Sequence, residues 1–247
     1  MRLQGKTAIV TGGGSGFGAG IARKFAAEGA SVMVADIDGD AAARVAIEIG
    51  GAAQVADVGD AASVMAMAQA AMEAFGRVDI LVNNAGITHK PKPMEEVTED
   101  EFDRVFRVNA KSVYLTARAL VPSMKAAKAG AILNVASTAG LSPRPNLNWY
   151  NASKGWMITA TKTMAVELAP FGIRVNAIAP VAGETPLLAS FMGEDTPEMR
   201  AKFLATIPLG RVSAPEAMAN AAGLLVPDAA GVGTGVWLEG DAGAGYV

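Results

Sequence analysis

Short apolar segments alternate with longer helical segments along almost the whole chain, and this alternation constrains the fold more than any other feature. The apolar segments, predicted to be strands, are residues 6–10, 31–35, 53–56, 78–82, 131–136, 173–178 and 236–238. Most are continuous apolar runs, which is typical of strands buried on both faces. Amphipathic or alanine-rich segments, predicted to be helices, are residues 17–28, 39–49, 61–75, 99–121, 149–169 and 215–226.

Repeated strand–helix units predict an α/β fold, with a Rossmann-type doubly wound parallel sheet in a three-layer α/β/α arrangement. No internal repeat or linker divides the 247 residues, so we predict a single domain over residues 1–247. We expect Pro122 and Pro170 to end the helices that precede them, because proline cannot continue a helix. Residues 183–208 do not fit the alternation, since they mix prolines, acidic residues and apolar residues. We predict that they form a lid over the site.

Composition excludes several classes of protein. There is no cysteine and one histidine, His89, which excludes disulfides, cysteine nucleophiles and multi-histidine metal sites, so we predict no metal. The net charge is −3 with scattered basic residues, which gives no indication of a nucleic-acid partner. The first ten residues lack the apolar core of a signal peptide, and no apolar run approaches the ~20 residues that span a bilayer. We therefore expect a cytoplasmic protein without a membrane partner.

A glycine-rich loop, residues 11–18 (TGGGSGFG), joins the first predicted strand to the first predicted helix. Glycines let the backbone approach a pyrophosphate, and the helix N-terminus supplies free N–H groups and a partial positive charge. A flexible turn is the alternative interpretation, since glycine-rich loops are common. The contacts predicted with a dinucleotide are Gly12, Ser15, Gly16, Phe17 and Gly18.

Asp36 lies at the end of the second predicted strand. A carboxylate there would accept hydrogen bonds from the adenosine ribose hydroxyls and repel a 2′-phosphate. No Arg or Lys directly follows it, so the predicted cofactor is NAD rather than NADP; a solvated turn aspartate is the alternative. Ligands bind at the carboxyl ends of strands in open α/β sheets. Further cofactor contacts are therefore expected at Ile37, Asp57, Val58, Asn84, Ala85 and Gly86.

The sequence YNASK, residues 150–154, begins a predicted helix. The i, i+4 spacing places Tyr150 and Lys154 on one helical face. A free tyrosine has a pKa of ~10, and we expect the neighbouring ammonium and a nicotinamide cation to lower the pKa of Tyr150. The phenol would then accept an alcohol proton while hydride leaves for the nicotinamide. A surface Tyr beside a surface Lys is the alternative, but Ser137 and Asn109 lie upstream in the order that the chemistry needs.

These motifs together resemble the short-chain dehydrogenase/reductase family over essentially the whole chain. Residues 11–18 match the family's TGxxxGxG, residues 83–86 its NNAG and residues 150–154 its YxxxK. Residues 180–185 match its PGxxxT, except that Val181 replaces the glycine. Several motifs in the family's order make this resemblance specific.

The resemblance implies a role for each member of a catalytic set: Asn109, Ser137, Tyr150 and Lys154. Ser137 would hydrogen-bond the substrate oxygen, and Tyr150 would be the acid/base. Lys154 would lower the pKa of Tyr150 and hold the nicotinamide ribose, and Asn109 would support a water-mediated proton relay to Lys154. Tyr150 and Lys154 thus also count as cofactor contacts.

Two departures from the family pattern bear on cofactor and subunit contacts. The resemblance implies that Pro180 contacts the cofactor and that Thr185 contacts the nicotinamide carboxamide. Because valine avoids positive φ, Val181 is expected to change the backbone angles of the loop that carries Thr185. Residues 239–243 read EGDAG, where the family commonly has VDGG.

The predicted activity is hydride transfer between NAD(H) and a secondary alcohol or ketone. A 3-oxoacyl-[acyl-carrier-protein] reductase and a sugar 1-dehydrogenase are alternatives with the same chemistry. A catalytically silent NAD-binding or sensing protein and an S-adenosylmethionine-dependent methyltransferase are alternatives of another class. The family usually assembles as tetramers, which implies a homotetramer, or a homodimer, through the helices at 99–121 and 149–169.

The residues predicted to contact the substrate are Ser137, Trp149, Leu187 and Phe191. His89 is interpreted as a loop residue and Arg144 as a solvated arginine. Substrate contact is the alternative for both, with Arg144 meeting an anionic substrate.

Overall fold

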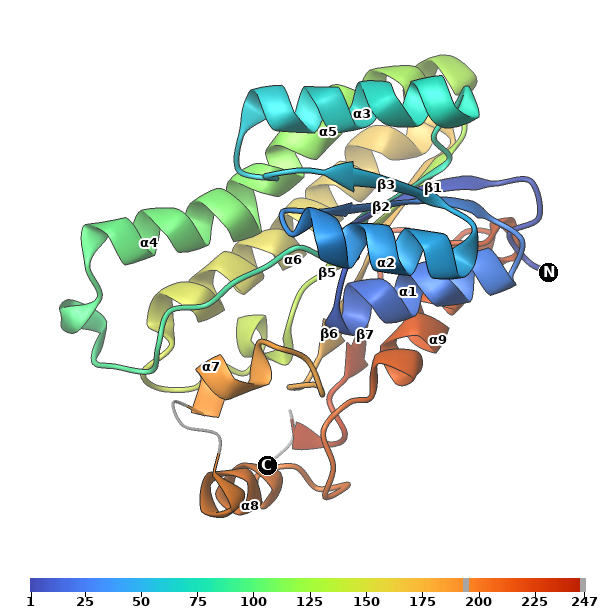
Figure 1. The fold of residues 1–247 in the computed structure, drawn as a ribbon. Helices are drawn as coiled ribbons and strands as arrows, with labels where there is room; N and C mark the ends of the chain where they lie inside the picture. Colours follow the sequence, from blue (N-terminus) through green and yellow to red (C-terminus); the bar gives the residue numbers. More distant parts are fainter. Residues whose placement is uncertain (193–195, 245–247) are drawn as a thin grey trace.

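The computed structural model describes residues 1–192 and 196–244 and has a seven-stranded parallel sheet at its centre (Figure 1). In sheet order the strands are β3 (Ala52–Val55), β2 (Ser31–Asp36), β1 (Thr7–Thr11), β4 (Ile80–Asn83), β5 (Gly130–Val135), β6 (Ile173–Pro180) and β7 (Trp237–Gly240). The strand order reverses between β1 and β4, which is where open α/β sheets bind ligands. The predicted doubly wound parallel sheet is confirmed. Residues 193–195 of the predicted lid and 245–247 of the predicted domain lie outside the described residues.

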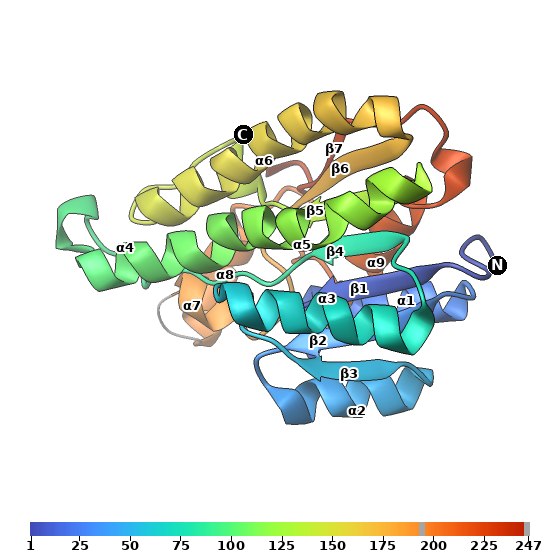
Figure 2. The same cartoon turned by 90° about the horizontal axis from the view of Figure 1, so that it is seen from above.

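Helices cover both faces of the sheet, as the two views show (Figures 1 and 2). One face carries α1 (Gly16–Ala27), α2 (Gly39–Ile49) and α9 (Pro215–Leu225), and the other carries α3 (Ala61–Phe75), α5 (Ser112–Ala127) and α6 (Asn148–Leu168). Each layer encloses its own apolar core, centred on Phe25 in the first and on Met67 and Leu120 in the second. Burial on both faces explains why the strands are continuous apolar runs.

Two short helices, α7 (Leu188–Met192) and α8 (Pro197–Leu204), follow β6 and lie apart from these layers, beyond its carboxyl end (Figure 1). They occupy the segment predicted as a lid. Within the described residues, no helix is both long enough and apolar enough to cross a membrane.

The predicted helix 99–121 is present as an uninterrupted helical stretch, but it contains a π-helical turn and extends to Ala127. It comprises α4 (Glu99–Phe106), a π-helical turn (Arg107–Lys111) and α5. The prediction that Pro122 ends the helix is wrong, because α5 runs through it to Ala127. Leu120 and Met124 are buried on either side of the proline, so packing holds the helix where the lost N–H would weaken it. Pro170 does follow the end of α6, as predicted.

A buried chain of hydrogen bonds joins the central strands to the two long helices. Thr116 Oγ1 on α5 donates to Asn83 Oδ1 (2.9 Å), and Asn83 Nδ2 donates to Asn134 Oδ1 on β5 (2.9 Å). Asn134 Nδ2 then donates to Thr161 Oγ1 on α6 (2.8 Å). All four side chains are buried, so this network fixes α6, which carries Tyr150, against the sheet.

Candidate active site

The glycine loop between β1 and α1 is shaped by close backbone contacts. Gly12 and Gly16 have φ of +60° and +51°, a region that side chains with a Cβ rarely adopt. A Cβ on Gly18 would lie 2.1 Å from the Gly12 carbonyl oxygen. Asn84 Nδ2 donates to the carbonyls of Thr11 (2.8 Å) and Gly12 (3.0 Å), which ties the loop to the end of β4. Ser15 precedes α1 without a side-chain cap, so the N–H groups of the first turn remain available to an anion.

A single cavity of about 570 Å³ extends from this loop to the start of α6. Its volume lies within the range of small-molecule and cofactor sites. The predicted cofactor residues that line it are Gly12, Ser15, Gly16, Phe17, Asp36, Ile37, Asp57, Val58, Asn84, Ala85, Gly86, Tyr150, Lys154, Pro180 and Thr185. Ser137, Leu187 and Phe191, predicted to contact substrate, also line it. Gly18 packs behind the loop instead.

Two aspartates lie at the end of the cavity formed by β2 and β3. Asp36 is oriented by the backbone, because its carboxylate accepts from Gly14 N (2.9 Å) and Asp38 N (3.1 Å). Among the described residues, no cation forms an ion pair with Asp36. Asp57 differs, since Arg107 of the π-helical turn pairs with it at 3.2 Å. No sequence pattern singled out this arginine, which lies fifty residues further along the chain.

The catalytic end of the cavity is built from α6 and the segment that follows β5. Tyr150 and Lys154 are each 4 % exposed, and Ser137 is 9 % exposed. Ser137 is held in an extended conformation, where its Oγ accepts from Ala139 N (3.1 Å). The segment packs closely on α6, because a Cβ on Gly140 would lie 2.7 Å from the backbone of Lys154. The structure thus brings the predicted Ser, Tyr and Lys side chains into one buried corner.

Burial is the main cause of the pKa shifts of Tyr150 and Lys154. It raises the pKa of the Tyr150 phenol to about 12, although a hydrogen bond with the Ser137 side chain acts in the opposite direction. It lowers the pKa of the Lys154 ammonium to about 8, and this ammonium donates to the Val135 carbonyl at 2.8 Å. Desolvation of the phenolate thus outweighs the Ser137 hydrogen bond in the polypeptide itself. The lowering of the Tyr150 pKa expected from Lys154 together with a nicotinamide cation stays a prediction.

Asn109 lies in the π-helical turn and is fully buried. Its Nδ2 donates to the Ile87 carbonyl and to Ser153 Oγ (both 2.9 Å), and its Oδ1 accepts from Ile87 N (2.9 Å). A Cβ on Gly86 would lie 3.3 Å from Lys154 Nζ and 3.5 Å from Asn109 Oδ1. Asn109 is therefore beside Lys154, but its side chain does not line the cavity. The proton-relay role stays a prediction.

Comparison with known proteins identifies the family to which this chain belongs. The family model described as "Enoyl-(Acyl carrier protein) reductase" matches residues 12–245. The chain belongs to the short-chain dehydrogenase/reductase family. It is 49 % identical to 4-formylbenzenesulfonate dehydrogenase of Comamonas testosteroni, over 98 % of this chain and 99 % of that relative. It is 41 % identical to galactitol 2-dehydrogenase of Agrobacterium fabrum, over 87 % and 88 %.

A solved structure gives the same result. The 3-ketoacyl-(acyl-carrier-protein) reductase of Brucella melitensis, complexed with NADH, superposes with a TM-score of 0.94 at 50 % identity. The likeness covers 98 % of this chain and 99 % of that one. The present chain is thus an oxidoreductase of the short-chain dehydrogenase/reductase family.

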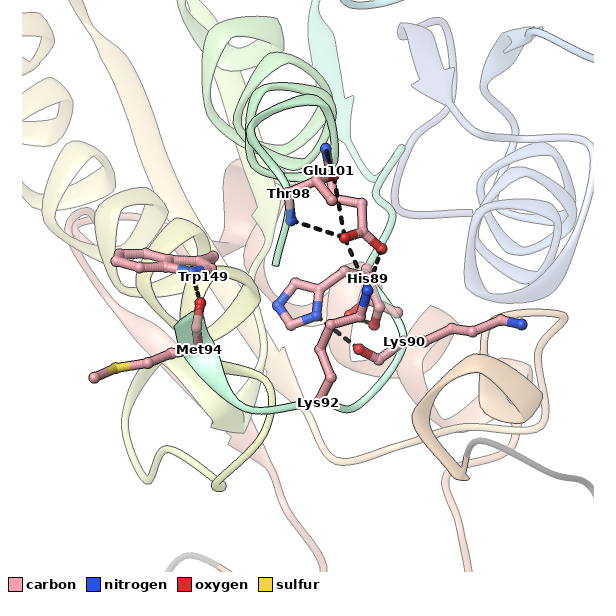
Figure 3. A network of polar contacts seen from close by, with 8 residues as sticks. His89, Lys90, Lys92, Met94, Thr98, Glu101 and Trp149 are labelled. Atoms are coloured by element: carbon pink, nitrogen blue, oxygen red, sulfur yellow. Dashed lines mark hydrogen bonds and ion pairs between the residues drawn. The ribbon is translucent and has the colours of Figure 1, made fainter. Parts of the chain in front are cut away.

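Two residues considered for substrate contact lie elsewhere in this dehydrogenase/reductase (Figure 3). Trp149 Nε1 donates to the Met94 carbonyl (3.2 Å), and its ring packs edge-on against Phe102. It does not line the cavity, so the substrate contact predicted for it has no support in the structure. His89 is 1 % exposed and shares a hydrogen bond between its Nδ1 and the Lys90 carbonyl (2.9 Å). It too lies outside the cavity, which agrees with its interpretation as a loop residue.

The family departure at Val181 is accommodated without strain. Val181 is buried, its N–H donates to the Gly240 carbonyl (3.0 Å), and its φ is not among the positive ones. The next residues still bring Thr185 to the glycine loop, where a Cβ on Gly16 would meet its side chain at 2.9 Å. The altered segment 239–243 therefore packs against the strand end that leads to Thr185.

Two further side chains line the cavity that were not predicted to do so or were predicted to be solvated. Phe203, from α8, lines the cavity, and no sequence pattern had singled it out. Arg144 lines it as well and is half-buried, so it is less exposed to solvent than the interpretation as a solvated arginine expected.

Proposed function

We propose that this dehydrogenase/reductase interconverts a secondary alcohol and a ketone with NAD(H), using Tyr150 as the acid/base. One observation carries the proposal: a single cavity joins the glycine loop and Asp36 to Ser137, Tyr150 and Lys154. A dinucleotide that spans the cavity would place its two halves at these two ends.

The residues present fit a nicotinamide dinucleotide. The close contacts at Gly12, Gly16 and Gly18 leave a cradle that a Cβ would fill, and the N-terminus of α1 offers N–H groups to the pyrophosphate. The carboxylate of Asp36 keeps free lone pairs for ribose hydroxyls and has no cationic partner among the described residues. Its uncompensated charge would repel a 2′-phosphate, which favours NAD over NADP.

The protein's own groups divide the work at the catalytic end. Ser137 would donate its hydroxyl hydrogen to the substrate oxygen and so hold the reacting carbon beside the nicotinamide. Tyr150 would take the alcohol proton in oxidation and return it to the carbonyl oxygen in reduction. Bound NAD⁺ would accept the hydride, and its positive ring would favour the phenolate. Lys154 would add a second positive charge to the same corner and reach the nicotinamide ribose.

The segment 183–208 is proposed to cover the substrate. Leu187 and Phe191 line the cavity, and the Phe191 ring lies 5.2 Å from the Tyr150 ring, centroid to centroid. Such a cover would exclude water from the transfer.

Relatives broaden the substrates worth testing. Their names include an aromatic aldehyde that carries a sulfonate, a sugar alcohol and a 3-ketoacyl thioester. The last makes 3-ketoacyl reduction a second candidate function. A panel of secondary alcohols, ketones, aromatic aldehydes and an acetoacetyl thioester, followed by NADH absorbance, separates these candidates.

The decisive variant is Tyr150→Phe, with Tyr114→Phe as its control because Tyr114 is an exposed tyrosine on α5. Loss of the acid/base should lower kcat by about 10²- to 10⁴-fold. NADH binding, measured by fluorescence, should stay within about twofold, since the phenyl ring remains. Unchanged turnover by Tyr150→Phe would refute the acid/base role. A wild type that binds NADH but turns over no member of the panel would favour a sensing protein instead.

A further inference from the structure

Arg144 stands in the wall of the catalytic cavity, in the segment between β5 and α6. It shares this wall with Ser137 and Tyr150. Its backbone is held in place, because Asn151 Nδ2 on α6 donates to the Arg144 carbonyl at 2.7 Å. Two residues further on, the Asn146 carbonyl accepts from Lys92 N at 3.0 Å. The arginine is thus fixed relative to the helix that carries the acid/base.

The guanidinium has no counter-charge among the residues that the structure describes. No carboxylate forms an ion pair with it, and desolvation alone lowers its pKa. Among the described residues, the carboxylates that line the cavity are Asp36, the last residue of β2, and Asp57, which follows β3. Two strands lie between β2 and β5 and three lie between β3 and β5, so the carboxyl ends of β2 and β3 lie on the order of 14 Å and 19 Å from the carboxyl end of β5. A half-buried cation without a partner is costly, and an incoming anion would remove that cost.

A phenylalanine ring lies beside Arg144, and another lies beside Tyr150. The Arg144 guanidinium lies 5.1 Å from the centroid of the Phe203 ring. Phe191 packs on Tyr150, and both phenylalanines line the cavity. An apolar or aromatic body would therefore contact the two phenylalanines while one end meets the phenol and the other meets the arginine.

From this arrangement we infer that Arg144 binds a carboxylate or sulfonate of the substrate, separated from the reacting carbonyl by an apolar, preferably aromatic, body. The planar guanidinium matches both anions with two parallel N–H donors. The inference rests on the proposed function and adds to it the substrate class and the residue that selects it.

The test compares two ketones of the same shape and different charge, 4-acetylbenzoate and the neutral 4-acetylbenzamide. Reduction by NADH is followed in the wild type and in Arg144→Met, Arg144→Lys and Arg44→Met. Arg44 is exposed on α2 and outside the cavity, so its variant has the same net charge as Arg144→Met. We expect Arg144→Met to lower kcat/KM for the benzoate by about 10- to 100-fold. The amide should change by less than about threefold, and Arg44→Met should change neither.

Arg144→Lys keeps the charge and loses the planar fork, so it should retain part of the preference for the benzoate. If Arg144→Met folds poorly, Arg144→Lys provides the test in its place. Repeating the comparison with 4-acetylbenzenesulfonate shows whether the site accepts both anions. An unchanged benzoate-to-amide ratio in Arg144→Met overturns the inference.

A binding measurement separates this inference from the proposed function. Calorimetric titration of both ketones into the NADH complex needs no turnover. If the wild type binds 4-acetylbenzoate through Arg144 but reduces no ketone, the proposed function fails and the inference stands. If the complex binds the benzoate no better than the amide, the inference is wrong even where both are reduced.

Discussion

Replacing Lys154 with methionine should stabilise the fold while abolishing turnover. The ammonium is almost completely buried, and burial lowers its pKa from the ordinary 10.5 to about 8. Each pKa unit corresponds to about 1.4 kcal/mol, so keeping Lys154 charged costs the native state about 3 kcal/mol at neutral pH. Methionine has a similar length and carries no charge to desolvate.

The pH dependence of this gain has a definite sign. Between about pH 8 and about pH 10.5 the unfolded chain holds the lysine proton and the native chain does not, so wild-type stability rises with pH. Below that window the full penalty is present. The advantage of Lys154→Met should therefore shrink by about 2 kcal/mol between about pH 7 and about pH 9.5. Loss of the hydrogen bond to the Val135 carbonyl adds an offset that is the same at each pH, so it does not affect this difference.

Urea unfolding of both proteins at a series of pH values measures the difference directly. A matched control is Lys162→Met. Lys162 is an exposed lysine on the same helix, and its ammonium lies over the Trp237 ring of β7. A narrowing of the gap with pH that Lys154→Met shows and Lys162→Met does not share identifies Lys154 as its source. A gap between wild type and Lys154→Met that is constant with pH would refute the view that this lysine is a desolvated cation. Such a result would also remove the electrostatic role proposed for it in catalysis.

Two further predictions concern the cofactor and the core. Asp36→Ala should reduce the preference for NAD over NADP, measured as the ratio of kcat/KM values, by at least about tenfold. Asp40→Ala, at an exposed neighbour on α2, should leave this ratio unchanged. A wild type that prefers NADP would contradict the role of Asp36 in selecting NAD. Asn134→Leu should lower the free energy of unfolding by about 3 kcal/mol, because it strips partners from the buried Asn83 and Thr161 side chains. Exposed Gln69→Leu should change it by less than about 0.5 kcal/mol, and equal effects in urea titrations would contradict the role of the network.

The fold was predictable because burial on both faces of a parallel sheet leaves a direct trace in the sequence. β1 and β4 are buried at every position, and each contains a run of three apolar residues flanked by buried polar ones. The glycine loop was equally readable, since backbone contacts as close as that at Gly18 exclude any side chain. Local rules failed where tertiary packing opposed them. Pro122 lies inside α5 because buried neighbours hold the helix on both sides of it.

The state of the catalytic groups was harder to predict than their identity. The motif places Tyr150 and Lys154 on one face of α6, but it does not reveal how much water their surroundings exclude. Both are buried, and that burial raises the pKa of the phenol and lowers that of the ammonium. Each group is thus pushed toward its neutral form, and further positive charge in the cavity would favour the phenolate that oxidation needs.

Arg107 and Arg144 show why charge pairing cannot be read from sequence position. Both are arginines that follow structural breaks, one in a π-helical turn and one between two prolines. Arg107 meets Asp57, fifty residues away in the chain, and their charges compensate each other. Arg144 lies over the Phe203 ring and forms no ion pair with a carboxylate among the described residues. Its charge therefore remains available to an anion bound in the cavity. Arg107 therefore has a structural role and Arg144 a role in substrate selection. The difference follows from the carboxylate of Asp57, which lies beside Arg107 and has no counterpart beside Arg144 among the described residues.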